Sequence, residues 1–555
     1  MRRLFMRSLT KRVVLIGIAA FCAVGVVLQA QNSKDRDLKN GWEVHRELEI
    51  PAEARTAVKD YFPSFLEYQD IVMFHPKVGY YASGRVSFTS DYQTFPIVLA
   101  PLFGHMVAEQ IFFMWDGMRK AGTLGEKEQF TIAEFGAGDG VLAESILDYL
   151  QRKSIGDTRW RQFANQVLYV CYDRSPALND TQRERNARFG SRFAARLADA
   201  TNLTATIPPG SFKGVVLSNE LPDAFSVHKI ALSPSGTAEV AFVVPSLPGT
   251  NWSTVRPLFS AEIAKQIEEA DLDIEKKFFS GRAAPDLYLT RASFVSLLEN
   301  LLGSKEYEPA ANAMQFQEIY VPVSAIPEVA AHLRRYASVY AGILAKNPHG
   351  LVTYINPGVE SFIQGAANVL KSGYVLTIDY GSTWDGILAE DSFSHFRTYG
   401  PAHKGSIQSP EVEDGAGGAS DPEIWNPYLG PTLNDMTTDV NFSLMVVEGE
   451  HVGLKPIYFG SQGALRSGTS VTLDNPPRDR HEKFDAWSYD FENPSVYKVL
   501  VQQKEGSDKA YRFPDKNPES LGLDRTRLTE AQRTRATQIE KQLIGDSAAV
   551  PAPVR

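Results

Sequence analysis

Short hydrophobic runs alternate with longer amphipathic segments through the middle of the chain. Helical spacing of apolar positions fills residues 141–151 and 181–189, between runs that have the length and composition of buried strands. Buried strands separated by helices predict an α/β fold with a doubly wound, mainly parallel sheet. The predicted strands cover residues 130–135, 167–172, 215–218 and 374–378.

The pattern changes on both sides of this core and once inside it. Residues 233–350 carry strand and helix signals of their own, which predict an insertion. Residues 401–431 are rich in Gly, Pro, Ser and Asp and predict a long surface loop. The predicted segments are a signal peptide or signal anchor (1–31), an N-terminal helical cap (32–128), the first part of the core (129–232), the insertion (233–350), the second part of the core (351–470) and a C-terminal extension (471–555) with a disordered end.

The N-terminus has the layout of an export signal. Five basic residues among the first twelve precede an apolar run over 13–28, and a polar stretch follows residue 31. The run is short for a membrane span, so cleavage near Ala30 and retention as an anchor both stay open. The sequence therefore predicts an exported or membrane-anchored protein, and an anchor with the domain facing the cytoplasm is the alternative.

Charge and cysteine content exclude several classes of function. The chain carries a formal charge of −9 and has no basic stripe beyond its first residues, which argues against a nucleic-acid partner. Its two cysteines, Cys22 and Cys171, cannot form a disulfide framework or a thiolate metal site. We expect no metal requirement.

A glycine-rich loop follows the first predicted strand directly. Gly136, Gly138 and Gly140 stand between that strand and the helix from residue 141, with Glu134 just ahead of them. Glycine allows a tight turn and a close approach of a ligand, and the helix N-terminus offers amide donors to an anion. This arrangement predicts a site for a nucleotide cofactor.

Acidic residues at the ends of the next strands extend the predicted site. Asp173 ends the second strand, where a carboxylate can accept hydrogen bonds from ribose hydroxyls. Asp199 is either an adenine contact or a solvated turn residue. No further glycine follows Gly140 at the spacing of a dinucleotide fingerprint, which favours S-adenosylmethionine (SAM) over NAD.

The chain resembles the MidA-like methyltransferases, whose mitochondrial members are arginine methyltransferases that assist the assembly of respiratory complex I. The resemblance extends from about Tyr61 to Leu465 and implies a class I methyltransferase fold with SAM as cofactor. Blocks in the family's order carry it, at residues 134–140, 173–176, 218–228, 378–381, 397–399 with His403, 435–442 and 461–462.

One family block is altered. It is expected to close over the cofactor, within the 32–128 segment, and occurs here as residues 90–97, with Asp91 retained as a cofactor-binding candidate. Ile97 stands where the family has glutamate. The resemblance therefore leaves the affinity for SAM, and activity itself, to be tested.

Acidic and amide side chains follow the third and fourth predicted strands. Asn219, Glu220 and Asp223 come after residues 215–218, and Asp379 ends the run 374–378. Ligands of such sheets bind at the carboxyl edge, so these side chains are candidates to orient a substrate. A guanidinium needs carboxylates for that task. Capping of a following helix is the alternative role of Asp223.

Three functions are compatible with these features. The first is transfer of a methyl group to a protein side chain, with arginine implied by the resemblance and the insertion as a lobe for the protein substrate. The second is methylation of a small molecule on the same fold. The third is a binding or assembly module without catalysis, which Ile97 and the N-terminal segment suggest.

Overall fold

A computed structural model describes most of the chain. The predicted signal segment 1–31 and most of the loop 401–431 lie outside the described residues. Within the described part, no helix is long and apolar enough to cross a membrane. The described residues are 48, 50–82, 86, 93–279, 286–389, 395–399, 427–428, 430–492, 497–504 and 528–548.

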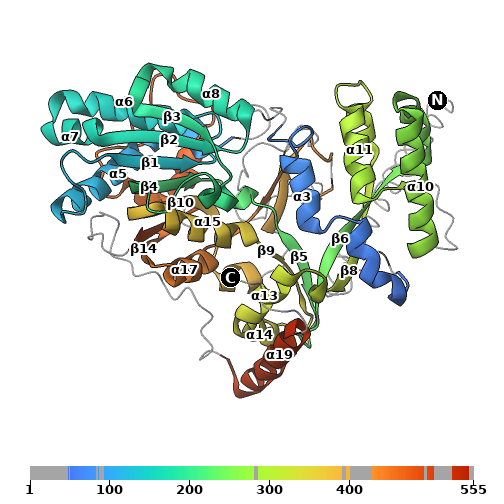
Figure 1. Cartoon of the computed structure of the whole chain (residues 1–555). Coiled ribbons are helices and arrows are strands. Elements are labelled where there is room, and N and C mark those ends of the chain that lie inside the picture. The colour runs from blue at the N-terminus through green and yellow to red at the C-terminus, as the bar shows by residue number, and fades with distance from the viewer. Residues whose placement is uncertain are drawn as a thin grey trace, which may run out of the picture.

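An eight-stranded sheet forms the centre of the molecule, in the order β14-β15-β10-β4-β1-β2-β3, with β13 paired to β10 (Figure 1). β3, β2, β1, β4 and β10 are parallel to one another, and β15 runs antiparallel to both of its neighbours. The predicted mainly parallel sheet is confirmed. Its strands are β1 (Phe130–Phe135), β2 (Val167–Asp173), β3 (Phe193–Leu197), β4 (Phe212–Asn219), β10 (Leu370–Ser382), β13 (Val440–Asn441), β14 (Leu454–Ser461) and β15 (Tyr497–Lys504).

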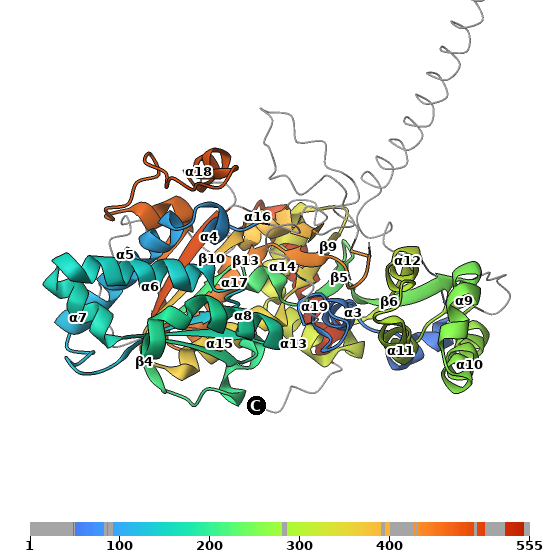
Figure 2. The same ribbon diagram turned by 90° about the horizontal axis from the view of Figure 1, so that it is seen from above.

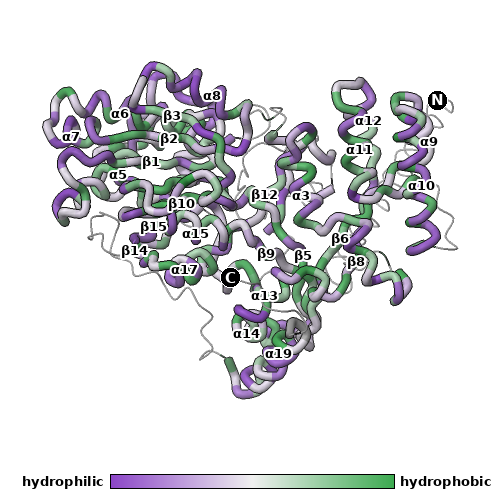
Figure 3. The backbone as a smooth tube through the Cα atoms, viewed as in Figure 1, coloured by the Kyte–Doolittle hydropathy of each residue, from purple (hydrophilic) through white to green (hydrophobic). Residues whose placement is uncertain are grey.

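Helices cover both faces of this sheet, as a doubly wound fold requires. Side chains alternate between faces along a strand, so Ile132 of β1 packs with one helical layer and Ala133 with the other. Hydrophobic residues concentrate along the strands (Figure 3). One layer holds α5 (Leu102–Lys120), α6 (Val141–Gly156) and α7 (Thr158–Gln166), and the other holds α15 (Pro357–Val369) and α17 (Phe442–His451).

Two elements of the core differ from the prediction. Helix α8 (Pro176–Asn186) begins before residue 181, because the Ser175 hydroxyl caps it by accepting from the N–H of Leu178 and Pro176 occupies its first turn. The segment 471–555 is more than an extension, since β15 lies inside the central sheet. The buried apolar residues of this strand run only from Val499 to Val501. A run this short among polar neighbours does not predict a strand.

A second, antiparallel sheet forms a separate lobe, with strands in the order β7-β6-β5-β9 and β8 paired to β6. Seen from above, the helices of this lobe lie at the end of the molecule opposite α7 (Figure 2). The sheet starts before residue 233 and ends after residue 350, so it takes in strands on both sides of the predicted insertion. The lobe contains β5 (His228–Leu232), β6 (Ala238–Pro248), β7 (Asp286–Tyr288), β8 (Gln315–Pro322), β9 (Leu351–Ile355), α9 (Gly249–Val255), α10 (Ala261–Phe278), α11 (Arg291–Leu301) and α12 (Tyr307–Ala313).

The N-terminal segment 32–128 is shared between the two units. Helix α3 (Phe65–Phe74) packs its buried face on the second sheet, and a capping box between Ser64 and Glu67 begins it. Helix α5 packs on the central sheet instead. The remaining elements are η1 (Ala52–Ala57), α2 (Val58–Tyr61), α4 (Phe95–Val98), η2 (Ala187–Arg192), η3 (Ala200–Ala205), η4 (Pro222–Ala224), η5 (Arg256–Leu258), η6 (Val323–Ala325), α13 (Pro327–Arg335), α14 (Ala337–Lys346), α16 (Trp384–Ala389), β11 (Phe396–Tyr399), β12 (Asp435–Thr438), η9 (Gln462–Arg466), α18 (Phe484–Glu492) and α19 (Glu530–Ala548).

Candidate active site

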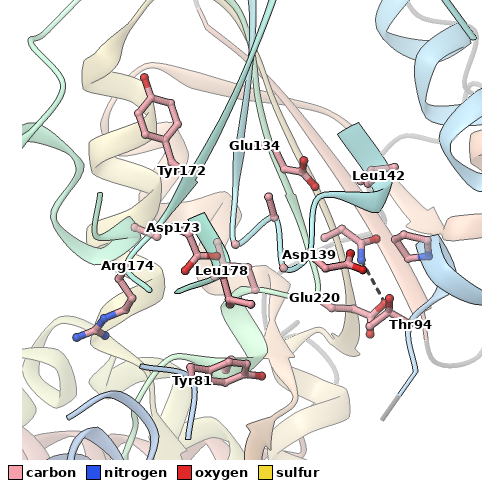
Figure 4. Close-up of a pocket in the computed structure, with 18 of the residues that line it drawn as sticks. Tyr81, Thr94, Glu134, Asp139, Leu142, Tyr172, Asp173, Arg174, Leu178 and Glu220 are labelled. Atoms are coloured by element: carbon pink, nitrogen blue, oxygen red, sulfur yellow. Dashed lines mark hydrogen bonds between the residues drawn. The ribbon is translucent and has the colours of Figure 1, made fainter. Parts of the chain in front are cut away.

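A cleft with about 1000 Å³ of empty space lies at the carboxyl ends of β1 to β4 (Figure 4). Residues from three parts of the chain line it: the turns after these strands, the segment around α4, and two aromatic positions at and after the end of α3. Its lining includes Phe74, Tyr81, Thr94, Pro96, Ile97, Glu134, Gly136, Gly138, Asp139, Asp173, Arg174, Asp199, Thr201, Asn219, Glu220 and Phe225.

The glycine loop turns sharply between β1 and α6. Gly136, Gly138 and Gly140 have φ angles of 69°, 53° and 81°, a left-handed region that L-residues with a side chain rarely adopt. A Cβ at Gly136 would stand 2.7 Å from Leu221. The predicted loop therefore brings backbone and the N-terminus of α6 to the wall of the cleft, where an anion is stabilised.

Two predicted acidic residues line the end of the cleft that β2 and β3 form. Asp173 is buried and accepts a hydrogen bond of 2.9 Å from the N–H of Ser175. Burial raises the pKa of Asp173 to about 6. Asp199 caps η3 by accepting from the N–H of Thr201 at 2.8 Å and also lines the cleft, so both interpretations of this residue are compatible with the structure.

Glu134 stands at the end of β1, buried against the neighbouring strand. Its Oε2 accepts hydrogen bonds from the Tyr169 hydroxyl at 2.7 Å and from the Cys171 thiol at 3.7 Å. Burial raises the pKa of Glu134 to about 7. A charged ligand that binds beside a carboxyl group shifts its pKa, and here such a shift changes the protonation state near neutral pH.

Glu220 lines the opposite end of the cleft (Figure 4), and the preceding residue, Asn219, is also part of the lining. Glu220 has a left-handed φ of 48°, which costs a non-glycine residue about 1–3 kcal/mol. Its N–H donates to the carbonyl of Ile378 at 2.9 Å, and its carboxylate accepts from Asn219 Nδ2 at 3.2 Å. Desolvation and the charge of Asp223 raise the pKa of Glu220 to about 8. One carboxyl group is thus held at the cleft wall in spite of backbone strain and desolvation.

Asp223 and Asp379 lie behind Glu220 and do not line the cleft. The predictions that Asp223 orients a substrate and that Asp379 faces the crevice are therefore wrong. Asp379 is fully buried just past the last residue of β10 that pairs with β4, and its Oδ2 accepts from the N–H of Asp223 at 3.3 Å. Asp223 does not cap a helix; it lies within η4 and accepts from the Tyr380 hydroxyl at 2.7 Å. Burial raises the pKa of both carboxyl groups, and the charge of Asp223 raises that of Asp379 further.

The described part of the altered family block lines the cleft. Thr94, Pro96 and Ile97 line it, and Ile97 adds an apolar surface where the family has a carboxylate. Asp91, predicted to bind the cofactor, lies outside the described residues.

Sequence reasoning missed two aromatic contributions from the N-terminal segment. Phe74 ends α3, and its ring stacks on that of Tyr81 at 5.8 Å between centroids. The guanidinium of Arg174 lies 4.4 Å from the centre of the Phe74 ring, beside Asp173. No motif marks these residues, because their place in the cleft depends on how α3 packs on the second lobe.

Comparison with known proteins gives the family. Residues 106–459 match the family described as "putative S-adenosyl-L-methionine-dependent methyltransferase". The chain belongs to this family. The predicted resemblance is confirmed, and SAM is the cofactor that the family uses.

Individual relatives are distant. Over 210 residues the chain is 26% identical to a Drosophila melanogaster protein named "Protein arginine methyltransferase NDUFAF7 homolog, mitochondrial". That match covers 35% of this chain and spans 44% of the relative's length. A Burkholderia thailandensis crystal structure with bound S-adenosyl-homocysteine is 18% identical with a TM-score of 0.48, covering 84% of this chain and 97% of that one. A native structure from the same organism has the same identity and TM-score, covering 85% and 98%.

The residues of the cleft fit SAM. The turn of left-handed glycines and the α6 N-terminus suit the carboxylate of its methionine part, and Asp173 suits ribose hydroxyls. Glu134 and Glu220 place two carboxyl groups at the cleft wall that can ionise beside a cationic ligand. Among the described residues, no group of three or more His, Cys, Asp or Glu side chains could hold a metal ion.

Proposed function

We propose that this protein is an active methyltransferase that methylates arginine side chains of a protein. One observation carries the proposal: Glu220 lines the same cleft as the glycine loop and Asp173, with two more carboxyl groups packed behind it. That arrangement joins a cofactor site to a concentration of carboxyl groups, which ionise more readily beside a cation and so suit a cationic group as methyl acceptor.

The chemistry of a guanidinium explains the need for several carboxyl groups. Bound SAM would supply the methyl group from its positively charged sulfur, which would keep the electron pair of the broken sulfur–carbon bond. The guanidinium nitrogen must be oriented toward it, and its proton must be taken up as the new bond forms. Glu220 can accept hydrogen bonds from the guanidinium and then the proton, because its pKa of about 8 suits a proton acceptor near neutral pH.

The two carboxyl groups behind Glu220 act through it. Asp223 and Asp379 are buried, so neither can contact a substrate in the cleft. The negative charge of Asp223 raises the pKa of Glu220 and makes it a stronger proton acceptor. Asn219 holds the Glu220 carboxylate through its side-chain amide.

A protein substrate is favoured over a small molecule. The second lobe borders the cleft, because α3, which packs on its sheet, ends at the cleft-lining Phe74. The name of the Drosophila relative, a protein arginine methyltransferase, agrees with this choice.

We further propose export or membrane anchoring through the N-terminal segment, which fractionation of the tagged full-length chain tests.

The test is transfer of a labelled methyl group from SAM to a panel of acceptors. The panel contains peptides with one arginine, the same peptides with lysine in its place, and small amines. Mass spectrometry should find a methyl group on arginine with wild-type protein and almost none with Glu220→Gln. Transfer to small amines alone would support the small-molecule alternative, and SAM binding without any transfer would support a binding module.

A further inference from the structure

Arg397 lies one layer behind the acidic end of the cleft. It belongs to β11, which pairs with β12, and β12 packs against η4 where Asp223 lies. The Arg397 guanidinium stands 4.7 Å from the centre of the Tyr380 ring. The hydroxyl of the same tyrosine donates to Asp223 at 2.7 Å. Arg397 is thus one side chain away from Asp223 and does not line the cleft.

Asp439 and His395 fix the position of this guanidinium. Arg397 Nη2 forms an ion pair with Asp439 Oδ1, and His395 Nδ1 bonds to Asp439 Oδ2 at 2.7 Å. The N–H of Asp439 also donates to the carbonyl of His395 at 2.9 Å. Only 16% of the Arg397 side chain is exposed, so the charge acts through a medium in which water screens it little.

We propose that Arg397 is a positioning residue for methyl transfer, which holds Tyr380 and Asp223 in place behind Glu220 and supplies positive charge to this buried acidic cluster. The inference rests on the proposed function, because it assigns the substrate contact to Glu220. It adds a residue outside the cleft on which that contact depends.

Electrostatics supports the geometric argument. The charge of Arg397 and the Tyr380 hydrogen bond lower the pKa of Asp223, against the larger effect of burial. Ionised Asp223 in turn raises the pKa of Glu220, so the arginine acts on Glu220 through Asp223. The titratable and charged groups around this cluster are Asp379 and Tyr380 on β10, Arg397 and Tyr399 on β11, His395 just before β11, Asp435 on β12, Asp439 in its ion pair with Arg397, Tyr497 on β15, and Glu220 after β4.

A thermal double-mutant cycle tests the contact without any need for activity. Arg397→Met, Asp223→Asn and the double variant of the full-length chain are compared with wild type at pH 8. Arg397→Met should lower the Tm by several degrees, and by clearly less when residue 223 is already asparagine. Arg119→Met is the matched control, since 17% of that side chain is exposed and it lies at the end of α5. Its loss of Tm should be the same in both backgrounds.

Kinetics then tests the functional part. Arg397→Met should lower kcat about 10- to 100-fold with an unchanged Kd for SAM, and Arg397→Lys should recover part of the loss. Without the arginine, Asp223 keeps its proton to higher pH, so the pKa of Glu220 falls. The acid limb of the pH profile of kcat therefore moves to lower pH. A merely structural role would reduce kcat without moving that limb.

The outcomes separate this inference from the proposed function. Additive losses of Tm in the cycle, or an unchanged kcat profile in Arg397→Met, would overturn the role of Arg397. Wild-type protein that methylates no arginine would instead overturn the proposed function, and with it the functional part of the inference. The thermal cycle would then still decide whether Arg397 holds Asp223.

Discussion

The N–H of Asp223 donates a hydrogen bond of 3.3 Å to the carboxylate of Asp379, joining residues 156 positions apart in the chain. The contact fastens η4 to the end of β10 and places two buried carboxyl groups behind Glu220. Like charges so close disfavour one another's ionisation. The fold therefore keeps a costly acidic cluster beside the cofactor cleft, which is characteristic of a functional site.

The cost of this cluster should be visible in the pH dependence of stability. The pKa of Glu220 is about 8 in the folded protein against an ordinary value of 4.5. Stability linked to this group is therefore fully present below pH 4.5 and is lost as the pH rises through 8. Glu220→Gln cannot ionise, so it should raise the Tm by about 2–4 °C at pH 8.5 and change it little at pH 5. Glu126→Gln is the control, because Glu126 is 86% exposed. An equal change in Tm at both pH values would contradict the explanation.

Binding of SAM should become tighter as the pH rises from 6 to 8. Burial raises the pKa of Glu134 to about 7, and SAM carries positive charge on its sulfur and its amino group. A cation beside Glu134 favours the ionised form, so binding should release protons near pH 6.5. Calorimetry in two buffers of different ionisation enthalpy measures that release. Glu134→Gln should reduce it, and S-adenosyl-homocysteine, which lacks the charged sulfur, should show less of it. Proton uptake on SAM binding would refute this role for Glu134.

Asp173 should carry a large share of the cofactor affinity. A buried carboxylate that accepts hydrogen bonds from ribose hydroxyls contributes about 1.5–3 kcal/mol, so Asp173→Asn should weaken SAM binding by roughly 10- to 100-fold. Asp180→Asn on α8 is a matched control, because that side chain is 71% exposed and pairs with Arg183 of the same helix. Equal Kd values for Asp173→Asn and wild type would remove Asp173 from the cofactor site.

Much of the fold and of the cofactor site could be predicted from the sequence. Strands β1 and β2 are short, mainly apolar runs, and the glycine loop follows β1 directly, so local pattern alone identifies them. Gly136, Asp173 and Glu220 do line one cleft, because consecutive parallel strands end at the same edge of the sheet.

The rest depends on contacts between distant segments. Nothing local distinguishes Glu220, which lines the cleft, from Asp379, which lies behind it; the difference arises where β10 pairs with β4. Phe74 reaches the cleft only because α3 packs on the second lobe. Strand β15 gains its stability from insertion between β10 and β14, and an isolated pattern cannot reveal that.

A calorimetric titration of the full-length chain with SAM tests the central claim most directly. It compares wild type with Gly138→Arg, which places a large side chain in the glycine loop, where φ is 53°. Gly122→Arg is the matched control, because Gly122 also has a left-handed φ, 73°, but a Cβ added there would meet no atom within 4 Å. Saturable binding by wild type and Gly122→Arg that Gly138→Arg loses is the predicted result. Absence of binding by folded wild-type protein would contradict a working cofactor site.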